Sequence, residues 1–143
     1  MIRVGFIINY NPINWLGGYN FTINLINAIL LLKNRKIEPV LIVGKDSKLE
    51  NVNHHNFQII KSNIFINQGI LERLLNKFQI LILGRSKKYD EFFKEHKIDI
   101  ISHNSFFIGK KSIVKSFAWI PDFQFLHFPE NYSLKVRILK KTN

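Results

Sequence analysis

The sequence predicts an α/β fold in which a parallel sheet is flanked by helices. Short apolar runs of strand length alternate with stretches of helical periodicity, which is the order expected for βαβ units. Residues 4–10 form a continuous apolar run, as expected for a strand that is covered on both faces of a parallel sheet. The chain has 143 residues, 46% of them hydrophobic, so we take residues 1–143 as one domain with its own core.

The first half of the chain contains two predicted strands and one helix. A strand at 4–10 leads through a loop at 11–16 into a helix at 19–34, and a second strand at 40–43 ends at Gly44. The apolar positions of the helix share one face: Phe21, Leu25, Ala28 and Leu32, broadened by Ile26, Ile29 and Leu30. Asn20, Asn24 and Asn27 form a polar stripe on the same helix.

The second half continues the alternation after a polar loop at 45–56. The predicted elements are a short strand at 57–60, a helix at 69–78, an apolar run at 80–83 closed by Gly84, a charged helix at 87–97, and strands at 98–102 and 114–120. Ser133 is placed to cap the start of a further helix.

Composition excludes several classes of site. The chain has no cysteine, which rules out disulfides, thiolate catalysis and cysteine-based zinc sites and fits a reducing compartment. His54 and His55 lie in a polar loop without a carboxylate or third ligand at suitable spacing, so we expect no metal site. No segment reaches the roughly 18 to 20 apolar residues that span a bilayer, and no signal peptide is recognisable. We therefore expect a cytoplasmic protein.

The formal net charge of +11 favours anionic partners. Nucleotide phosphates and phospholipid head groups both qualify, and the latter would hold the protein peripherally at the inner face of a membrane. A nucleic-acid partner is disfavoured, because no recognised nucleic-acid-binding motif occurs and the basic residues are not interleaved with aromatic ones. A dispersed, solvated basic face remains the simplest explanation of the charge.

A first candidate site follows the last predicted strand. The segment FAWIPDFQFLHFPE (117–130) places a carboxylate, an amide, an imidazole and aromatic rings just past the carboxyl end of a strand, where α/β proteins bind ligands. Its candidate residues are Trp119, Asp122, Gln124, His127 and Glu130. Aromatic faces beside hydrogen-bonding groups suit a sugar or a nucleobase, and they would equally suit the surface of a partner domain.

A second candidate site lies at the start of the first helix and after a central strand. Gly17 and Gly18 allow the backbone to approach a ligand and present helix-start amides to an anion, although a tight turn explains them too. His103 follows a strand and is placed to bond a hydroxyl or phosphate, with a surface or capping histidine as the alternative. A dinucleotide fingerprint lacks its third glycine and its acidic residue, and no P-loop motif occurs.

With these residues identified, the chain resembles the N-terminal domain of a family 4-like glycosyltransferase of the GT-B fold. VGFIINYNPINWLGGYNFTINLINAI (4–29) resembles the first strand, the Trp-x-Gly-Gly loop and the asparagine-rich first helix, which include Trp15 and Asn20. His103 falls where many members place a histidine. WIPDFQFLHFPENYS (119–133) resembles a W-I-P-D-x-Q-H-L-H-x-P-E-x-x-S block, with Phe125 replacing its first histidine.

The resemblance implies a Rossmann-like domain that forms one half of a GT-B enzyme. It implies a retaining hexosyl-type transfer from a nucleotide-diphosphate sugar to a glycan or lipid-linked acceptor, as in cell-surface polysaccharide biosynthesis, without a metal or other cofactor. Gly17 and Gly18 would meet the donor phosphates, and His103 and Asp122 would be catalytic. Trp15, Asn20, Trp119, Gln124, His127 and Glu130 would bind substrate or the second domain.

The family's C-terminal donor-binding domain is absent from these 143 residues, so we expect the chain alone to be inactive. A missing domain or a partner chain would complete the enzyme. The alternatives are a non-catalytic nucleotide- or sugar-binding remnant and one subunit of a split enzyme.

Overall fold

The computed structural model describes residues 1–9, 15–47, 49, 56–66, 68–104, 106–119 and 127–134. Its centre is a five-stranded parallel sheet in the order β3-β2-β1-β4-β5. The strands are β1 (Ile2–Ile8), β2 (Ile37–Val43), β3 (Gln58–Lys61), β4 (Ile100–Asn104) and β5 (Lys115–Ala118). The helices are α1 (Leu16–Leu31), α2 (Ile70–Leu83) and α3 (Lys87–Glu95), followed by the 3-10 turn η1 (Pro129–Asn131). This arrangement confirms the predicted α/β, Rossmann-like fold.

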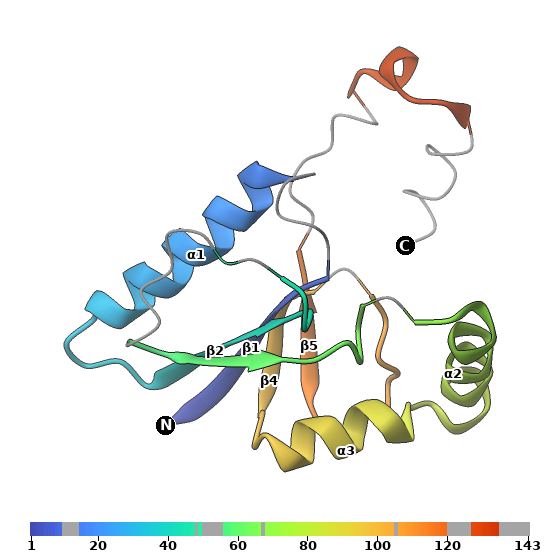
Figure 1. Cartoon of the computed structure of the whole chain (residues 1–143), viewed down its shortest axis with the longest axis horizontal. Helices are drawn as coiled ribbons and strands as arrows, with labels where there is room; N and C mark the ends of the chain where they lie inside the picture. The colour runs from blue at the N-terminus through green and yellow to red at the C-terminus, as the bar shows by residue number, and fades with distance from the viewer. Residues whose placement is uncertain are drawn as a thin grey trace.

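The order of the strands reverses at the centre of the sheet. From β1 the chain passes through α1 to β2 and on to β3 at one edge, and after α3 it returns to β4 on the other side of β1 (Figure 1). β1 and β4 are therefore neighbours that are far apart in sequence, with Phe6 opposite Ser102 in their register. α1, which follows β1, packs on one face of the sheet, and Ile108, which follows β4, belongs to the core on the other face.

The core consists of two layers, one on each face of the sheet, because successive side chains of a strand point to opposite faces. The layer against α1 contains Val4, Phe6, Ile8, Leu41 and Val43 with Tyr19, Ile23 and Ile26. The layer against α3 contains Ile7, Val40, Ile42 and Ile101 with Tyr89, Phe92 and Phe93. Figure 1 shows the sheet between these two helices, which is why the central strands read as continuous apolar runs.

Helix α1 begins at Leu16, three residues before the predicted start, and ends at Leu31. Gly17 and Gly18 thus lie in its first turn, although glycine's low helix propensity argues for a later start. The face buried against the sheet consists of Gly18, Tyr19, Thr22, Ile23 and Ile26. The helix is therefore rotated relative to the apolar face read from the sequence, and Phe21 is exposed at its amino-terminal end.

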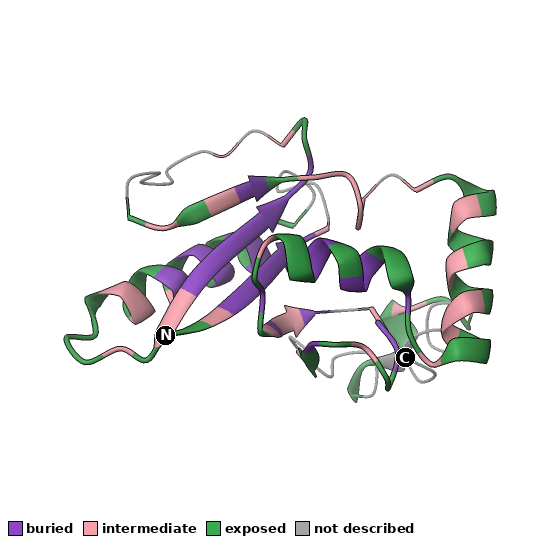
Figure 2. Cartoon of the chain, turned by 90° about the horizontal axis from the view of Figure 1, so that it is seen from below, coloured by how far each residue is buried: buried purple, intermediate pink, exposed green. Residues whose placement is uncertain are grey.

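Helix α2 is longer than predicted. It runs without interruption from Ile70 to Leu83 and so joins the expected helix at 69–78 to the apolar run at 80–83. Gly84 ends it in the left-handed conformation at φ 73°, and its N–H donates to the carbonyl oxygen of Ile80 at 2.9 Å. None of its residues is buried, as the absence of the buried colour along α2 in Figure 2 shows.

The remaining elements differ from the prediction by a few residues. β1 and β2 begin earlier than expected, at Ile2 and Ile37, and β4 is shifted to Ile100–Asn104. Ser86 caps α3, because its Oγ accepts a hydrogen bond from the backbone N–H of Tyr89 at 3.3 Å. The helix predicted to follow Ser133 falls mainly on residues 135–143, outside the described residues.

Across the described ranges, none of the helices combines the length and the apolar character needed to cross a membrane.

Candidate functional site

The carboxyl ends of β1 and β4 form the topological switch point of the sheet, where open α/β folds leave a crevice for ligands. Five rings from four segments gather there and are called the aromatic cluster below. They belong to Phe6 in β1, Trp15 and Phe21 at the start of α1, His103 in β4, and Trp119 just after β5. The fold therefore brings three of the predicted site residues, Trp15, His103 and Trp119, into one place.

His103 has an unusual backbone conformation. Its φ is +57°, in the left-handed region that non-glycine residues rarely enter. The register between β4 and β5 is irregular at the same point: Ser102 pairs with Phe117 and Asn104 pairs with Ala118, so His103 has no partner on β5. An irregularity of this kind changes the direction in which a side chain near the end of a strand points. A non-glycine residue held at positive φ costs on the order of 1–3 kcal/mol, and such residues gather at functional sites.

The residue that follows His103 holds this conformation in place. Asn104 is buried, and its side-chain amide donates to Ser116 Oγ at 2.5 Å. Its Oδ1 accepts a hydrogen bond from the backbone N–H of Phe106 at 2.6 Å. These contacts tie the end of β4 both to β5 and to the loop that follows, so the left-handed turn at His103 is supported from outside the aromatic cluster.

The His103 imidazole is half-buried among apolar rings. Its centroid lies 5.8 Å from Phe6, 5.6 Å from Phe21 and 5.3 Å from Trp119. Burial lowers the pKa of His103 below its ordinary value of 6.5, so the ring is neutral at pH 7. Ser102 Oγ lies 2.8 Å from Nδ1. When that hydroxyl donates to Nδ1, the ring proton sits on Nε2, which then offers a hydrogen-bond donor.

Trp119 is the centre of the aromatic cluster. Its ring stacks on Phe21 at a centroid distance of 4.5 Å and an interplanar angle of 12°. It also stacks on Trp15 at 5.8 Å and 21°. Trp15 and Phe21 expose 38% and 42% of their surface, so the cluster is an open aromatic platform and not a closed pocket. Platforms of this kind offer π-faces to planar or ring-shaped ligands.

Gly18 is needed for the position of Trp15. A Cβ added to Gly18 would lie 2.6 Å from three atoms of the indole, Cδ2, Cε3 and Cζ3, which is closer than atoms approach without displacement. Gly17 differs, because a Cβ added there would meet nothing within 4 Å. The two glycines therefore have separate roles: Gly18 makes room for the ring of Trp15, and Gly17 leaves the first turn of α1 open to its surroundings.

The amino terminus of α1 adjoins the aromatic cluster. Trp15 is its N-cap residue and makes no side-chain capping hydrogen bond, and no acidic residue occupies the first turn. The amides of Leu16, Gly17 and Gly18 precede the first intrahelical donor, the N–H of Tyr19, which bonds to the carbonyl oxygen of Trp15 at 3.2 Å. They have no intrahelical acceptor and point out of the helix end, as the first amides of every α-helix do. Because the helix dipole also favours negative charge here, this end of α1 suits an anion.

The other predicted site residues are not placed in this cluster. Asp122 and Gln124 lie outside the described residues. His127 and Glu130 are exposed in a short segment around η1, which Figure 1 shows apart from the sheet. Asn20 is exposed on α1 beside Phe21.

Phe6, Phe21 and Ser102 belong to the site but were not predicted from the sequence. Phe6 and Phe21 read as ordinary core residues, since each belongs to an apolar run or face. Phe6 lies in a strand and Phe21 near the start of a helix, and they can be recognised as site residues only when the fold brings these two elements together. Ser102 offered a usable signal, because a Ser-His-Asn run directly after an apolar strand places polar side chains at the carboxyl edge of the sheet.

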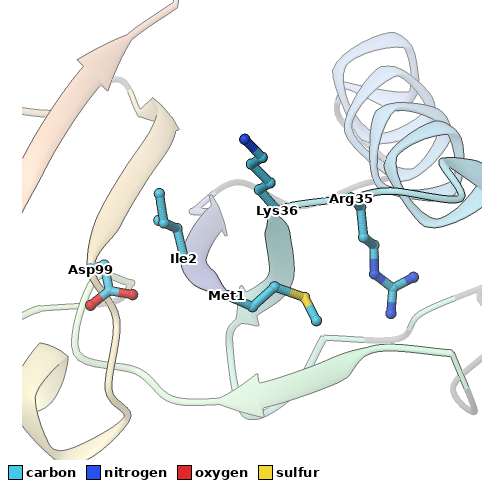
Figure 3. A pocket seen from close by; sticks show the side chains of 5 residues that line it. All are labelled: Met1, Ile2, Arg35, Lys36 and Asp99. Atoms are coloured by element: carbon cyan, nitrogen blue, oxygen red, sulfur yellow. The ribbon is translucent and has the colours of Figure 1, made fainter.

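A hollow in the surface lies away from this cluster. It has a volume of about 580 Å³ and is lined by Met1, Ile2, Arg35, Lys36 and Asp99 at the amino end of β1. Figure 3 shows the Lys36 and Arg35 side chains extending in different directions, so the polar groups do not converge on one point. In the described ranges, no group of three or more histidine, aspartate or glutamate side chains is arranged to hold a metal ion.

A scan against protein-family models gives no match, and searches of curated proteins and of solved structures give no significant match.

Proposed function

We propose that the chain is the acceptor-side half of a retaining glycosyltransferase, which moves a hexosyl group from a nucleotide-diphosphate sugar to a glycan or lipid-linked acceptor. The observation that carries the proposal is the open aromatic platform of Trp15, Phe21 and Trp119 at the switch point of the sheet, with His103 held beside it in a strained conformation. His103 and the segments that contain the platform residues, 4–29 and 119–133, are those on which the resemblance to family 4-like enzymes depends.

The aromatic rings bind the substrate by stacking. A sugar ring or a nucleobase laid on Trp119 or Phe21 buries its flat face, while its edge stays free for hydrogen bonds. His103 supplies one such bond, because its neutral ring can donate from Nε2 to a substrate hydroxyl. In this role His103 orients a hydroxyl in the transition state, and we assign the same role to Asp122.

The amino terminus of α1 binds the donor diphosphate. As the glycosidic bond to the nucleotide breaks, negative charge grows on the leaving phosphate. The amides of Gly17 and Gly18 then stabilise that charge, and they require no reorganisation because they are fixed in the helix. Gly17 suits this role because it carries no side chain and the space beside its Cα is open, since an added Cβ would meet nothing within 4 Å. The proposal needs no metal or other cofactor.

The remaining predicted residues contact the acceptor or the second half of the enzyme. Asn20, Gln124, His127 and Glu130 fill this role, together with the exposed edges of the platform. A GT-B enzyme reacts in a cleft closed between two domains that excludes water. We therefore expect the 143 residues by themselves to bind substrate without transferring sugar. The net charge of +11 is consistent with a cytoplasmic protein that contacts an anionic membrane surface carrying a lipid-linked acceptor.

Intrinsic fluorescence tests the proposal directly. The chain contains two tryptophans, and both belong to the aromatic cluster, so their emission reports on this site alone. Titration with UDP, GDP and their hexose conjugates is expected to change the emission saturably. Phe21→Ala should weaken binding by about ten- to a hundredfold, the usual loss for one stacked ring. Phe107→Ala, which removes an exposed phenyl ring outside the cluster, should leave the affinity unchanged.

Three results would count against the proposal. The first is no saturable change with any sugar nucleotide or glycan. The second is an equal loss of affinity in both variants. The third is binding to a single-stranded oligonucleotide that falls steeply with salt and ignores sugar nucleotides, which would favour the nucleic-acid alternative. A complementing donor domain can also be added to the chain. If the chain binds sugar nucleotides but no sugar transfer appears with that domain present, the chain is a non-catalytic binding module.

A further inference from the structure

Helix α2 presents its apolar face to solvent. Eight large apolar side chains on it expose between 41% and 82% of their surface. They are Ile70, Leu71, Leu74, Leu75, Phe78, Leu81, Ile82 and Leu83. A contiguous apolar patch of this extent is rare on a monomeric protein and marks an interaction surface.

The polar face of α2 is the one attached to the rest of the domain. Asn76 Oδ1 accepts a hydrogen bond from the buried Ser86 Oγ, and Gln79 Oε1 accepts one from the backbone N–H of Lys87 at 2.8 Å. Glu72 forms an ion pair with Lys88. All three contacts reach the start of α3, and Figures 1 and 2 show α2 beside that helix at one end of the molecule. These contacts fix the orientation of α2 and leave its apolar face outward.

The spacing of the exposed residues is that of a helix that packs against another helix. Leu71, Leu74, Phe78 and Leu81 follow one another at intervals of three, four and three, which is the a and d pattern of a two-helix seam. This row is also symmetric about Asn76: Leu71 mirrors Leu81, Leu74 mirrors Phe78, and Ile70 mirrors Ile82. A row with this symmetry is complementary to itself when two copies run antiparallel about a two-fold axis.

We propose that α2 packs antiparallel against α2 of a second copy of this chain, with the two-fold axis at the level of Asn76. Leu71 then meets the partner's Leu81, and Leu74 meets the partner's Phe78. The eight side chains can bury on the order of 500–1,000 Å² per copy. A standard-size interface buries roughly 800 Å² per partner, so this face alone approaches the area that a specific dimer needs.

The small net charge of α2 permits a second copy at this face. Two chains of net charge +11 repel each other, but α2 carries only Glu72, Arg73 and Lys77 and is close to neutral. An interfacial membrane helix has a polar face rich in lysine and arginine, ready to meet lipid head groups. The polar face of α2 has a different composition, with two basic residues and one acidic one, and its Glu72, Asn76 and Gln79 contact the start of α3.

Sedimentation equilibrium of the full chain over a concentration series tests the proposal. The wild type should dimerise, and Leu74→Lys should raise the dimer dissociation constant by roughly a hundredfold or more, since the change occurs twice at the centre of the interface. Leu31→Lys is the matched control, because Leu31 is equally apolar, is 83% exposed on α1, and adds the same charge without touching α2. Circular dichroism should show both variants folded.

Single cysteines then test the direction of the two helices, since the chain has none of its own. In the antiparallel dimer the two copies of Leu75→Cys lie about 3 Å apart along the axis, and those of Leu71→Cys about 15 Å apart. Oxidation should therefore crosslink Leu75→Cys much faster than Leu71→Cys. Equal crosslinking of both would overturn the antiparallel arrangement.

The proposal as a whole fails if the wild type stays monomeric at every concentration of the series. It also fails if Leu74→Lys changes the dimer dissociation constant no more than Leu31→Lys does. It also fails if a monomeric wild type floats with vesicles of anionic phospholipid and Leu74→Lys abolishes that flotation.

Discussion

The indole ring of Trp15 lies so close to Gly18 that it can take this position only because Gly18 has no side chain. A Cβ on Gly18 would lie 2.6 Å from the six-membered ring of Trp15. Trp15 in turn stacks on Trp119 at 5.8 Å. The glycine in the first turn of α1 thus determines where one wall of the aromatic platform stands.

Substituting alanine at the two glycines should have different effects on stability and on tryptophan emission. Gly17→Ala should raise the free energy of unfolding by about 0.5–1 kcal/mol, because the helix loses a flexible residue and the new methyl group enters open space. Gly18→Ala should displace Trp15, change the tryptophan emission and leave the protein roughly 1 kcal/mol less stable than Gly17→Ala. Urea unfolding followed by fluorescence measures both effects. Equal stabilities with unchanged emission would show that the Trp15 ring does not lie over Gly18.

The positive φ of His103 predicts which substitutions β4 accepts. His103→Asn should fold with little further cost, since asparagine enters the left-handed region readily. His103→Val should be less stable than His103→Asn by about 1–3 kcal/mol, because a β-branched side chain is strained at φ +57°. The comparison between the two variants matters more than either alone, since both remove the imidazole. If valine proves as stable as asparagine in urea unfolding, the strand continues through His103 without the left-handed turn.

The same histidine should make stability depend on pH. Its pKa is lowered in the folded protein by burial, so the unfolded chain binds the proton more tightly. Well above pH 6.5 both states are neutral and stability is at its full value. As the pH falls from 6.5 toward the lowered folded pKa, the unfolded state gains protons first and stability is lost.

The difference in unfolding free energy between the wild type and His103→Asn isolates this effect from the other four histidines. This difference should be constant well above pH 6.5. As the pH falls through 6.5, the wild type should lose stability relative to His103→Asn. A difference that stays constant down to pH 5, or that moves in favour of the wild type, contradicts a buried neutral imidazole.

Most of the sheet could be predicted from the sequence because each central strand is covered on both faces. Such strands appear as uninterrupted apolar runs, and Gly44 marks the end of one of them. The position of His103 at the carboxyl edge follows from the same reasoning. Its positive φ could not be predicted, because it depends on how β5 pairs around it and on the hydrogen bonds of Asn104.

Helix α2 and Phe21 show why other parts were not predicted. Pattern analysis assumes that an apolar face points to the core of the same chain. On α2 that face points to solvent, and residues 80–83, which were interpreted as a separate apolar run, are the last turn of one helix. Phe21 was grouped with core residues for the same reason, although it lies beside Trp119 in the candidate site.

The two outer strands limit how this sheet can be extended. β3 and β5 are each four residues long, and each carries a lysine, at Lys61 and Lys115. An added strand would gain few backbone hydrogen bonds along so short an edge, and it would have to accommodate an ammonium group there. Pairing of edge strands between two chains is therefore disfavoured. Since such pairing is the route by which exposed sheets polymerise, association of this chain should produce closed oligomers and not extended sheets.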